Sequence, residues 1–267
     1  MAKTTGIRKN PLEDYWYDFG KKLVEHAKVC EGSHVLDIGF GRGTSLIPAA
    51  EMVGPGGEVV GIDNWDPHVK CTTIEIERHG LTNATVVNMD ARKIDFDDNS
   101  FDFILSGFSY VFFSLADTNR LLRDGGRIAL SSWALEEDSE WMGELIQSKF
   151  PENIYAGHED MNEPEEDDRP RVYSRDTADS LTTKLRNAGF RDVRVLPEEK
   201  RYAFGSEEAW WDSMKHSGWQ GCLKRIDETG AGARAAFKKE AFRMLQMHRV
   251  GDSYPYTRAV LFGVGTK

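Results

Sequence analysis

Short apolar runs and longer amphipathic stretches alternate along most of the chain. The apolar runs have the length and the β-branched composition of strands. We expect seven strands, at residues 34–39, 58–63, 84–90, 101–107, 127–133, 191–197 and 259–265. Helical periodicity fills the intervals, and the helices expected at residues 68–80 and 178–189 each end at a glycine. This alternation is typical of an α/β fold with a mostly parallel sheet and helices on both faces.

The alternation of strands and helices breaks twice. An acidic segment at residues 151–173 follows the fifth expected strand, and a helix-like, tryptophan-rich segment at residues 206–252 separates the last two. We interpret both as insertions that cover the carboxyl edge of the sheet, within a single domain over residues 1–267. The same two segments fit an interface between two copies of the chain as well as a pocket, so the pattern leaves a homodimer open.

The bulk composition narrows the range of partners. The formal net charge is −10 and no basic stripe interrupts it, which disfavours a nucleic acid and favours a small molecule. The three cysteines have no CxxC spacing, so we expect free thiols in a reducing cytoplasm and no metal site. The chain has no signal-like start and no uncharged apolar run of about 18 residues, so we expect no membrane span.

The stretch VLDIGFGRG at residues 35–43 ends an expected strand in a glycine-rich turn. Its glycines, Gly39, Gly41 and Gly43, have GxGxG spacing, not the GxGxxG spacing of dinucleotide enzymes. Asp37 precedes them, and its carboxylate would repel a bound pyrophosphate. A cationic nucleoside without phosphate, such as S-adenosylmethionine, suits this loop. The alternative is that Asp37 only caps the following turn and that the glycines serve backbone geometry.

Further carboxylates follow the next two expected strands. Asp63 ends the second strand, where both of its oxygens can accept hydrogen bonds from ribose hydroxyls. Asn64 and Trp65 come next and can border an adenine, although a solvated turn explains Asn64 equally well. After the third strand, Asp90 and the backbone of Ala91 can bind the adenine edge. The carboxyl ends of parallel strands share one edge of a sheet, so these groups should lie together.

These motifs resemble those of the class I S-adenosylmethionine-dependent methyltransferases, in the ubiquinone/menaquinone C-methyltransferase-like branch. VLDIGFGRG occupies the position of the family's E/DxGxGxG motif, and GID contains its ribose-binding acid. MDA occupies the position of its adenine contact and FDFILSG that of its fourth strand. LLRDGGRIALSSW matches the segment that leads into the family's fifth strand, with Asp124 in place of the usual proline. The resemblance covers roughly residues 15–200.

The resemblance implies a Rossmann-like, doubly wound sheet with strand order 3-2-1-4-5-7-6 and an antiparallel strand 7. It also implies S-adenosyl-L-methionine as the cofactor and a small-molecule methyl acceptor. The cofactor contacts that it implies are Asp37, Gly39, Gly41, Gly43, Asp63, Asn64, Asp90, Ala91 and Ser106, with Tyr17 of the leading helix over the methionine end.

A methyltransferase of this kind works mainly by holding the acceptor in line with the methyl–sulfur bond for an SN2 displacement. A general base is optional, and His158 and His216 are the candidates by position, although a surface or packing histidine is the commoner case. Phe108, Tyr110 and Trp211 are candidates to line a pocket for an aromatic or hydrophobic acceptor, while a core role explains them about as well.

Other functions fit less well. An NAD-dependent oxidoreductase conflicts with the glycine spacing and with Asp37. A nucleic-acid methyltransferase would carry an Asn/Asp-Pro-Pro-Tyr motif where this chain has SGFSY, and an arsenite methyltransferase would need placed cysteines. The serious alternative is a methyltransferase-like scaffold that binds the cofactor without methyl transfer, as a rearrangement or cyclisation catalyst or a binding protein. The sequence does not select an oxygen, nitrogen or carbon acceptor.

Overall fold

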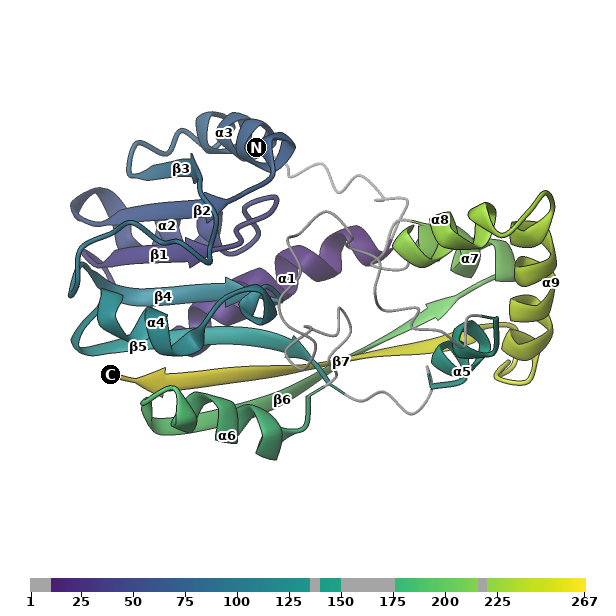
Figure 1. The fold of residues 1–267 in the computed structure, drawn as a ribbon. Helices are drawn as coiled ribbons and strands as arrows, with labels where there is room; N and C mark the ends of the chain where they lie inside the picture. Colours follow the sequence, from purple (N-terminus) through teal and green to yellow (C-terminus); the bar gives the residue numbers. More distant parts are fainter. Residues whose placement is uncertain (1–10, 135–139, 150–175, 216–219) are drawn as a thin grey trace. The chain divides into compact units, whose positions relative to one another are not determined.

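The computed structural model describes residues 11–134, 140–149, 176–215 and 220–267. Seven strands form one sheet in the order β3-β2-β1-β4-β5-β7-β6 (Figure 1). The strands are β1 His34–Ile38, β2 Glu58–Asp63, β3 Ala84–Asn88, β4 Phe101–Gly107, β5 Leu122–Trp133, β6 Arg191–Phe204 and β7 Tyr254–Thr266. Neighbouring strands from β3 to β5 pair in parallel, whereas β7 pairs antiparallel with β5. The expected strand order and the antiparallel seventh strand are confirmed.

Helices connect the strands at the positions that the periodicity predicts. They are α1 Pro11–Ala27, α2 Leu46–Val53, α3 Asp66–Arg78, α4 Leu115–Leu121, α5 Glu140–Lys149, α6 Ala178–Asn187, α7 Glu207–Lys215, α8 Gln220–Glu228 and α9 Ala233–Gln246, with short 3-10 turns η1 Gly54–Gly56 and η2 Tyr110–Phe112. Gly80 and Gly189 follow α3 and α6 with φ of 65° and 88°, the left-handed ends expected there. No helix in the described part of the chain combines the length and apolarity needed to cross a bilayer.

Three strands are longer than expected. Strand β5 starts at Leu122 because its register with β4 shifts before Arg127, so the turn-like residues around Gly125 form an irregularity within the strand. Strand β6 continues to Phe204, and β7 starts at Tyr254. The pairing of β7 with β5 ends at Val260, so the first residues of β7 have only β6 as a neighbour in the sheet. These residues alternate in burial, with Tyr254, Tyr256 and Arg258 buried and Pro255 exposed, but the proline and the arginine interrupt the apolar alternation that predicts a strand.

The chain divides into two compact units. We call Asp14–Ala134, Ser174–Glu198 and Val260–Lys267 the sheet unit, and Met1–Glu13, Leu135–Tyr173 and Glu199–Ala259 the helical unit. The tryptophan-rich segment between the last two strands forms α7, α8 and α9, as its pattern predicts. The acidic segment at residues 151–173 lies outside the described residues.

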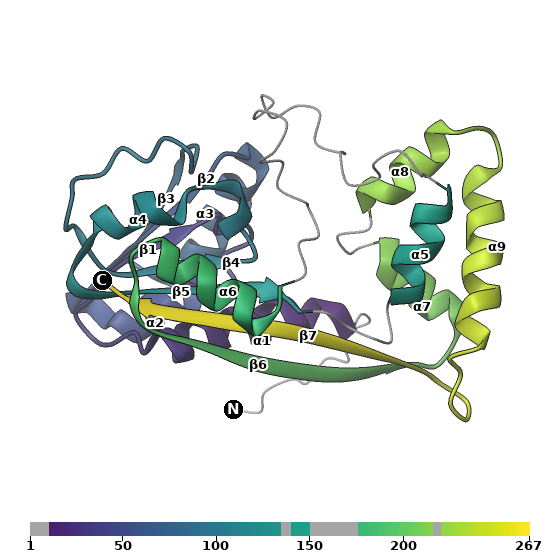
Figure 2. The ribbon, with the colours of Figure 1, turned by 60° about the horizontal axis from the view of Figure 1, so that its bottom comes forward.

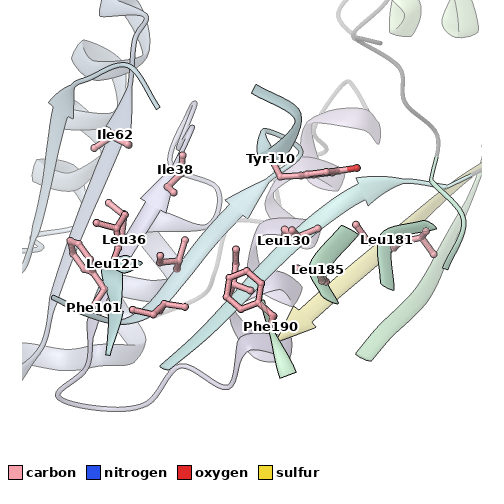
Figure 3. Packing of buried hydrophobic residues seen from close by; sticks show 14 residues of the cluster. Leu36, Ile38, Ile62, Phe101, Tyr110, Leu121, Leu130, Leu181, Leu185 and Phe190 are labelled. Carbon is pink, nitrogen blue, oxygen red and sulfur yellow. The ribbon is translucent and has the colours of Figure 1, made fainter. Parts of the chain in front are cut away.

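The core of the sheet unit lies on the central strands and the helices that cover them. Leu36, Ile38 and Leu130 are fully buried, as expected for parallel strands covered on both faces (Figure 3). Strand β7 shows how the two faces differ, because successive residues point to opposite sides. Phe262 contacts α1 through Phe19, with ring centroids 6.2 Å apart. A Cβ on the next residue, Gly263, would lie 2.9 Å from Leu185 of α6, the helix that lies along β7 in Figure 2.

The helical unit has an aromatic core of its own. Trp210 and Trp211 of α7 are 3% and 4% exposed. The ring of Trp141 stacks on Trp210 at 5.7 Å, and Trp211 lies 6.3 Å from the ring of Phe237 on α9. An apolar void of about 10 Å³, roughly the size of one water molecule, remains among side chains of α5, α7, α8 and α9. These helices therefore bury their apolar faces against one another.

Candidate cofactor site

The glycine loop follows β1 and has the conformation that its glycines allow. Gly39, Gly41 and Gly43 have φ of 72°, 55° and 76°, in the left-handed region that side chains disfavour. A Cβ on Gly39 would lie 2.5 Å from the Cβ of Ser109, and one on Gly43 would lie 2.9 Å from Thr72 of α3. The loop therefore needs glycine both for its turns and for the approach of its neighbours.

Helix α1 also contacts the segment that follows this loop. A Cβ on Gly20, in the middle of α1, would lie 2.1 Å from the carbonyl oxygen of Thr44. No side chain larger than hydrogen fits between the helix and the loop at this point. Tyr17, one turn earlier on α1, is 41% exposed. Within the sheet unit, α1 therefore packs directly against the segment that follows the glycine loop.

Asp37 is completely buried at the end of β1. Ser45 Oγ donates a hydrogen bond of 2.6 Å to Asp37 Oδ2, whereas Oδ1 has no hydrogen-bond partner among the described residues. Burial raises the pKa of this carboxyl to about 7; the Ser45 hydrogen bond opposes the rise and the nearby charge of Asp63 adds to it. A buried acceptor oxygen without a partner is costly, and a cationic ligand would satisfy it.

Asp63 ends β2 and accepts hydrogen bonds from three groups. Its Oδ2 accepts from the backbone N–H of Gly41 at 3.0 Å and from Nδ1 of His68 at 3.1 Å, and its Oδ1 accepts from the N–H of Trp65 at 3.0 Å. Partial burial would raise the pKa of Asp63, but these hydrogen bonds outweigh it and hold the pKa below its ordinary value. Asp63 therefore links the glycine loop to the start of α3.

The residues around Asp63 include one that sequence reasoning passed over. Asn64 is exposed, and Trp65 is 55% exposed with its ring edge-on to His68 at 4.4 Å. His68 looked like an ordinary helix residue in the sequence. Its position in the sequence indicates the contact, because His68 lies in the first turn of α3, directly after the strand that ends at Asp63. A side chain there can reach back to the end of the strand.

Asp90 lies at the same edge of the sheet. β2 pairs with β3 through Asp63 and Asn88, so Asp90 comes two residues beyond that pair. The Arg92 side chain donates to both oxygens of Asp90, from Nε at 3.0 Å and from Nη2 at 2.7 Å, and these bonds lower the pKa of Asp90. Ala91 is half-buried against the core. The structure thus brings Asp37, Asp63 and Asp90 to the carboxyl ends of three neighbouring strands.

Two serines join the end of β4 to the glycine loop. Ser106 is fully buried, and its hydroxyl lies 2.8 Å from that of Ser109. Ser109 Oγ donates to the carbonyl oxygen of Ile38 at 2.5 Å, directly before Gly39. Ser109 is thus a loop-contacting residue that the sequence analysis did not select.

Aromatic rings from α1, from β5 and from the turn before Ser109 meet one another. Phe108 has a positive φ of 59°, an unusual conformation for a bulky residue, and it stacks on Trp133 with centroids 4.2 Å apart and planes 24° apart. Trp16 of α1 contacts both rings edge-on, at 5.3 and 5.7 Å. Phe108 and Trp133 are each partly exposed. Trp16, Phe108 and Trp133, which we call the aromatic wall, include only one residue that the sequence analysis named.

The other residues predicted to line a pocket lie in different settings. Tyr110 is 5% exposed (Figure 3), its hydroxyl donates to buried Asp176, and Lys184 Nζ donates to the Tyr110 oxygen at 3.2 Å. Burial, followed by the bond to Asp176, raises the pKa of Tyr110. Trp211 belongs to the core of the helical unit. His158 and His216 lie outside the described residues.

Comparisons with known proteins identify the family of this chain. Residues 35–128 match the family described as "Methyltransferase domain". Nocamycin O-methyltransferase of Saccharothrix syringae is 31% identical over 98% of this chain and 95% of its own length. Aklanonic acid methyltransferase DauC of Streptomyces sp. (strain C5) is 37% identical over 45% of this chain and 56% of its own. A SAM-dependent methyltransferase structure from Aquifex aeolicus superposes with a TM-score of 0.51 at 25% identity, over 70% of this chain and 87% of that one.

The full-length relative, the family match and the confirmed sheet order lead to the same assignment. The chain belongs to the class I S-adenosylmethionine-dependent methyltransferases that act on small molecules.

Proposed function

We propose that Asp37, the glycine loop, Asp63 and Asp90 hold S-adenosylmethionine at the carboxyl ends of β1, β2 and β3. The observation that carries this proposal is Asp37, a fully buried carboxyl with one oxygen that lacks a partner among the described residues. A cationic ligand suits that oxygen and a diphosphate does not. The ribose hydroxyls bind Asp63, and the adenine edge binds Asp90 and the backbone of Ala91. Gly39, Gly41, Gly43, Asn64, Ser106 and Tyr17 complete the proposed contacts.

The cofactor supplies a methyl group that is already electrophilic, so the protein's contribution is to bind, orient and exclude water. Alignment of reactants of this kind can supply roughly 7–11 kcal/mol of the barrier reduction. Ser109 and the glycine loop fix the end of β1 beside the aromatic wall, through the Ser109 bond to Ile38 and the contact with Gly39. An acceptor that ionises easily needs no general base there; for others, His158 and His216 remain candidates.

We further propose a flat aromatic or hydrophobic acceptor, methylated at oxygen. The aromatic wall supports the first part, because partly exposed stacked rings favour another ring. The name of the relative that aligns along nearly the whole chain supports an oxygen acceptor. The net charge of −10 favours a small molecule over a nucleic acid, and three free cysteines fit a reducing, cytoplasmic compartment.

Replacing Asp63 with Asn tests the proposed ribose contact. Asparagine keeps one neutral acceptor oxygen, so one hydrogen bond to a charged group, worth about 1.5–3 kcal/mol, is lost and cofactor binding weakens by about 10- to 100-fold. We expect this loss for S-adenosylhomocysteine in isothermal titration. Glu58→Gln, at the opposite end of β2, is the matched control and should bind normally. Unchanged affinity in Asp63→Asn would remove this carboxylate from the site.

Replacing Trp133 with Leu tests the acceptor. The methyl acceptor is first identified by incubating the protein with a metabolite panel and methyl-labelled cofactor and finding the compound that gains the label. We expect Trp133→Leu to raise the KM for that acceptor by about 10-fold, the effect of losing an aromatic pair, while S-adenosylhomocysteine affinity is kept. Phe96→Leu, at a ring contact with Phe101 in the same unit, is the control. An unchanged KM would contradict the proposed role of the aromatic wall in binding the acceptor. Labelled cofactor that binds but never transfers its methyl group to any compound would contradict the proposed methyl transfer.

A further inference from the structure

We propose that His68 occupies, on Asp63, a hydrogen-bonding position that a ribose hydroxyl must take, so that the cofactor displaces it on binding. His68 then acts as an internal competitor of the cofactor. The inference rests on the proposed function, because it needs Asp63 to be the ribose acid.

The hydrogen bonds of Asp63 leave too few positions for the cofactor. A carboxylate offers about four acceptor positions, two on each oxygen. Oδ2 already accepts from Gly41 N–H and from His68 Nδ1, whereas among the described residues Oδ1 accepts only from Trp65 N–H. A ribose that donates one hydroxyl to each oxygen finds a free position on Oδ1 and none on Oδ2. One of the two donors to Oδ2 must leave.

Gly41 is the donor that cannot leave easily. Its carbonyl oxygen accepts a hydrogen bond of 2.9 Å from Thr72 Oγ1 on α3, and its φ is 55°. Moving its N–H would shift the glycine loop, together with the contact between Gly43 and Thr72. The backbone bond on the carboxylate is therefore part of the loop itself.

His68 is the donor that can leave. Its bond to Asp63 is made by a side chain on the first turn of α3, and that side chain is 28% exposed. The neighbouring ring of Trp65 is more than half exposed, so the histidine borders solvent on that side. Because an ionised carboxylate only accepts, Nδ1 carries the hydrogen in this bond, and rotation about the side-chain bonds of His68 transfers it to water. In the absence of ligand the same bond keeps the partly buried Asp63 satisfied.

The test compares two substitutions by titration with S-adenosylhomocysteine. His68→Phe keeps a flat ring against Trp65 but removes the donor, so we expect the affinity to rise about 3- to 10-fold, the effect of one hydrogen bond. His68→Gln keeps a donor and should bind like the wild type. His79→Phe, at the end of α3 and paired with Glu51, is the control and should change nothing. Circular dichroism confirms that each variant folds.

A second ligand separates competition from a general effect on the site. The 2′,3′-dideoxy analogue of S-adenosylhomocysteine has no hydroxyls to place on Asp63, so His68→Phe should give it no gain. Weaker binding of S-adenosylhomocysteine by His68→Phe, or an equal gain for both ligands, would overturn the inference. If Asp63→Asn weakens binding and His68→Phe brings no gain, only the competition fails. If Asp63→Asn has no effect, the proposed ribose contact fails as well.

Discussion

At pH 8, the Asp37→Asn variant is expected to have a free energy of unfolding about 4 kcal/mol above that of the wild type. Burial raises the pKa of Asp37 from 3.8 to about 7 in the folded protein. Between these values the unfolded chain is ionised while the folded chain keeps the proton, so stability falls as pH rises through this window. The cost is absent below pH 4 and complete above pH 7. Asparagine has no charge to bury, and it can still accept the hydrogen bond from Ser45.

Urea unfolding at pH 8 and at pH 4 measures this difference. The increase in the free energy of unfolding of Asp37→Asn over the wild type should be present at pH 8 and close to zero at pH 4. Asp124→Asn, at an exposed position within β5, is the control and should give no such pH-dependent gain. An equal effect of Asp37→Asn at both pH values would show that the buried charge is not its cause.

The same substitution should weaken binding of S-adenosylmethionine. Leaving a charged group without its partner in a buried pair costs about 2–5 kcal/mol, or roughly 30- to 5,000-fold in affinity. Because Asp37 is protonated at pH 6 and a cationic ligand favours its ionised form, wild-type binding should release a proton. Titrations in buffers with different ionisation enthalpies report that proton. Release by the variant equal to that of the wild type would assign the proton to another group.

The Gly39→Ala variant is expected to lose about 4 kcal/mol of stability. A left-handed conformation costs a non-glycine residue about 1–2 kcal/mol, and overpacking adds about 1–3 kcal/mol. The overpacking arises because the new Cβ would lie 2.5 Å from Ser109 Cβ and 2.6 Å from its Oγ. Moving Ser109 away would strain its bonds to Ile38 and Ser106. Urea unfolding measures the loss.

Gly80→Ala is the matched control for this effect. Gly80 has a similar φ of 65°, but a Cβ there would meet nothing within 4 Å, so only the conformational cost of about 1–2 kcal/mol applies. The difference between the two variants isolates the contact with Ser109. Adding Ser109→Gly to Gly39→Ala should restore part of the lost stability. Equal losses in Gly39→Ala and Gly80→Ala would contradict the proposed contact.

The sheet could be predicted from the sequence because its central strands are buried on both faces. Their apolar runs, such as the one that contains Leu36 and Ile38, carry a signal that does not depend on distant partners. The ends of β6 and β7 could not be predicted in the same way. The start of β7 buries Tyr254 and Tyr256 but also Arg258, and a buried charged residue interrupts the apolar alternation that predicts a strand.

The three carboxylates of the candidate site could also be predicted, since the ends of parallel strands share one edge. Their present partners could not. His68 and Arg92 come from the helix and the turn that follow Asp63 and Asp90, and only the folded backbone determines that they reach back. The aromatic wall depends in the same way on contacts between α1 and the ends of β4 and β5. Sequence pattern therefore indicates which acids lie together at the edge of the sheet, and the structure shows which protein groups hydrogen-bond to them.

The fit of α1 against the glycine loop has a practical consequence for protein engineering. Gly20 leaves no room beside Thr44, so the helix is shaped to its place on the Rossmann-like sheet. A truncated version that begins just before β1 would keep every strand of the sheet yet expose the apolar surface that α1 covers. Shortened or fused versions of this enzyme should therefore start ahead of Pro11.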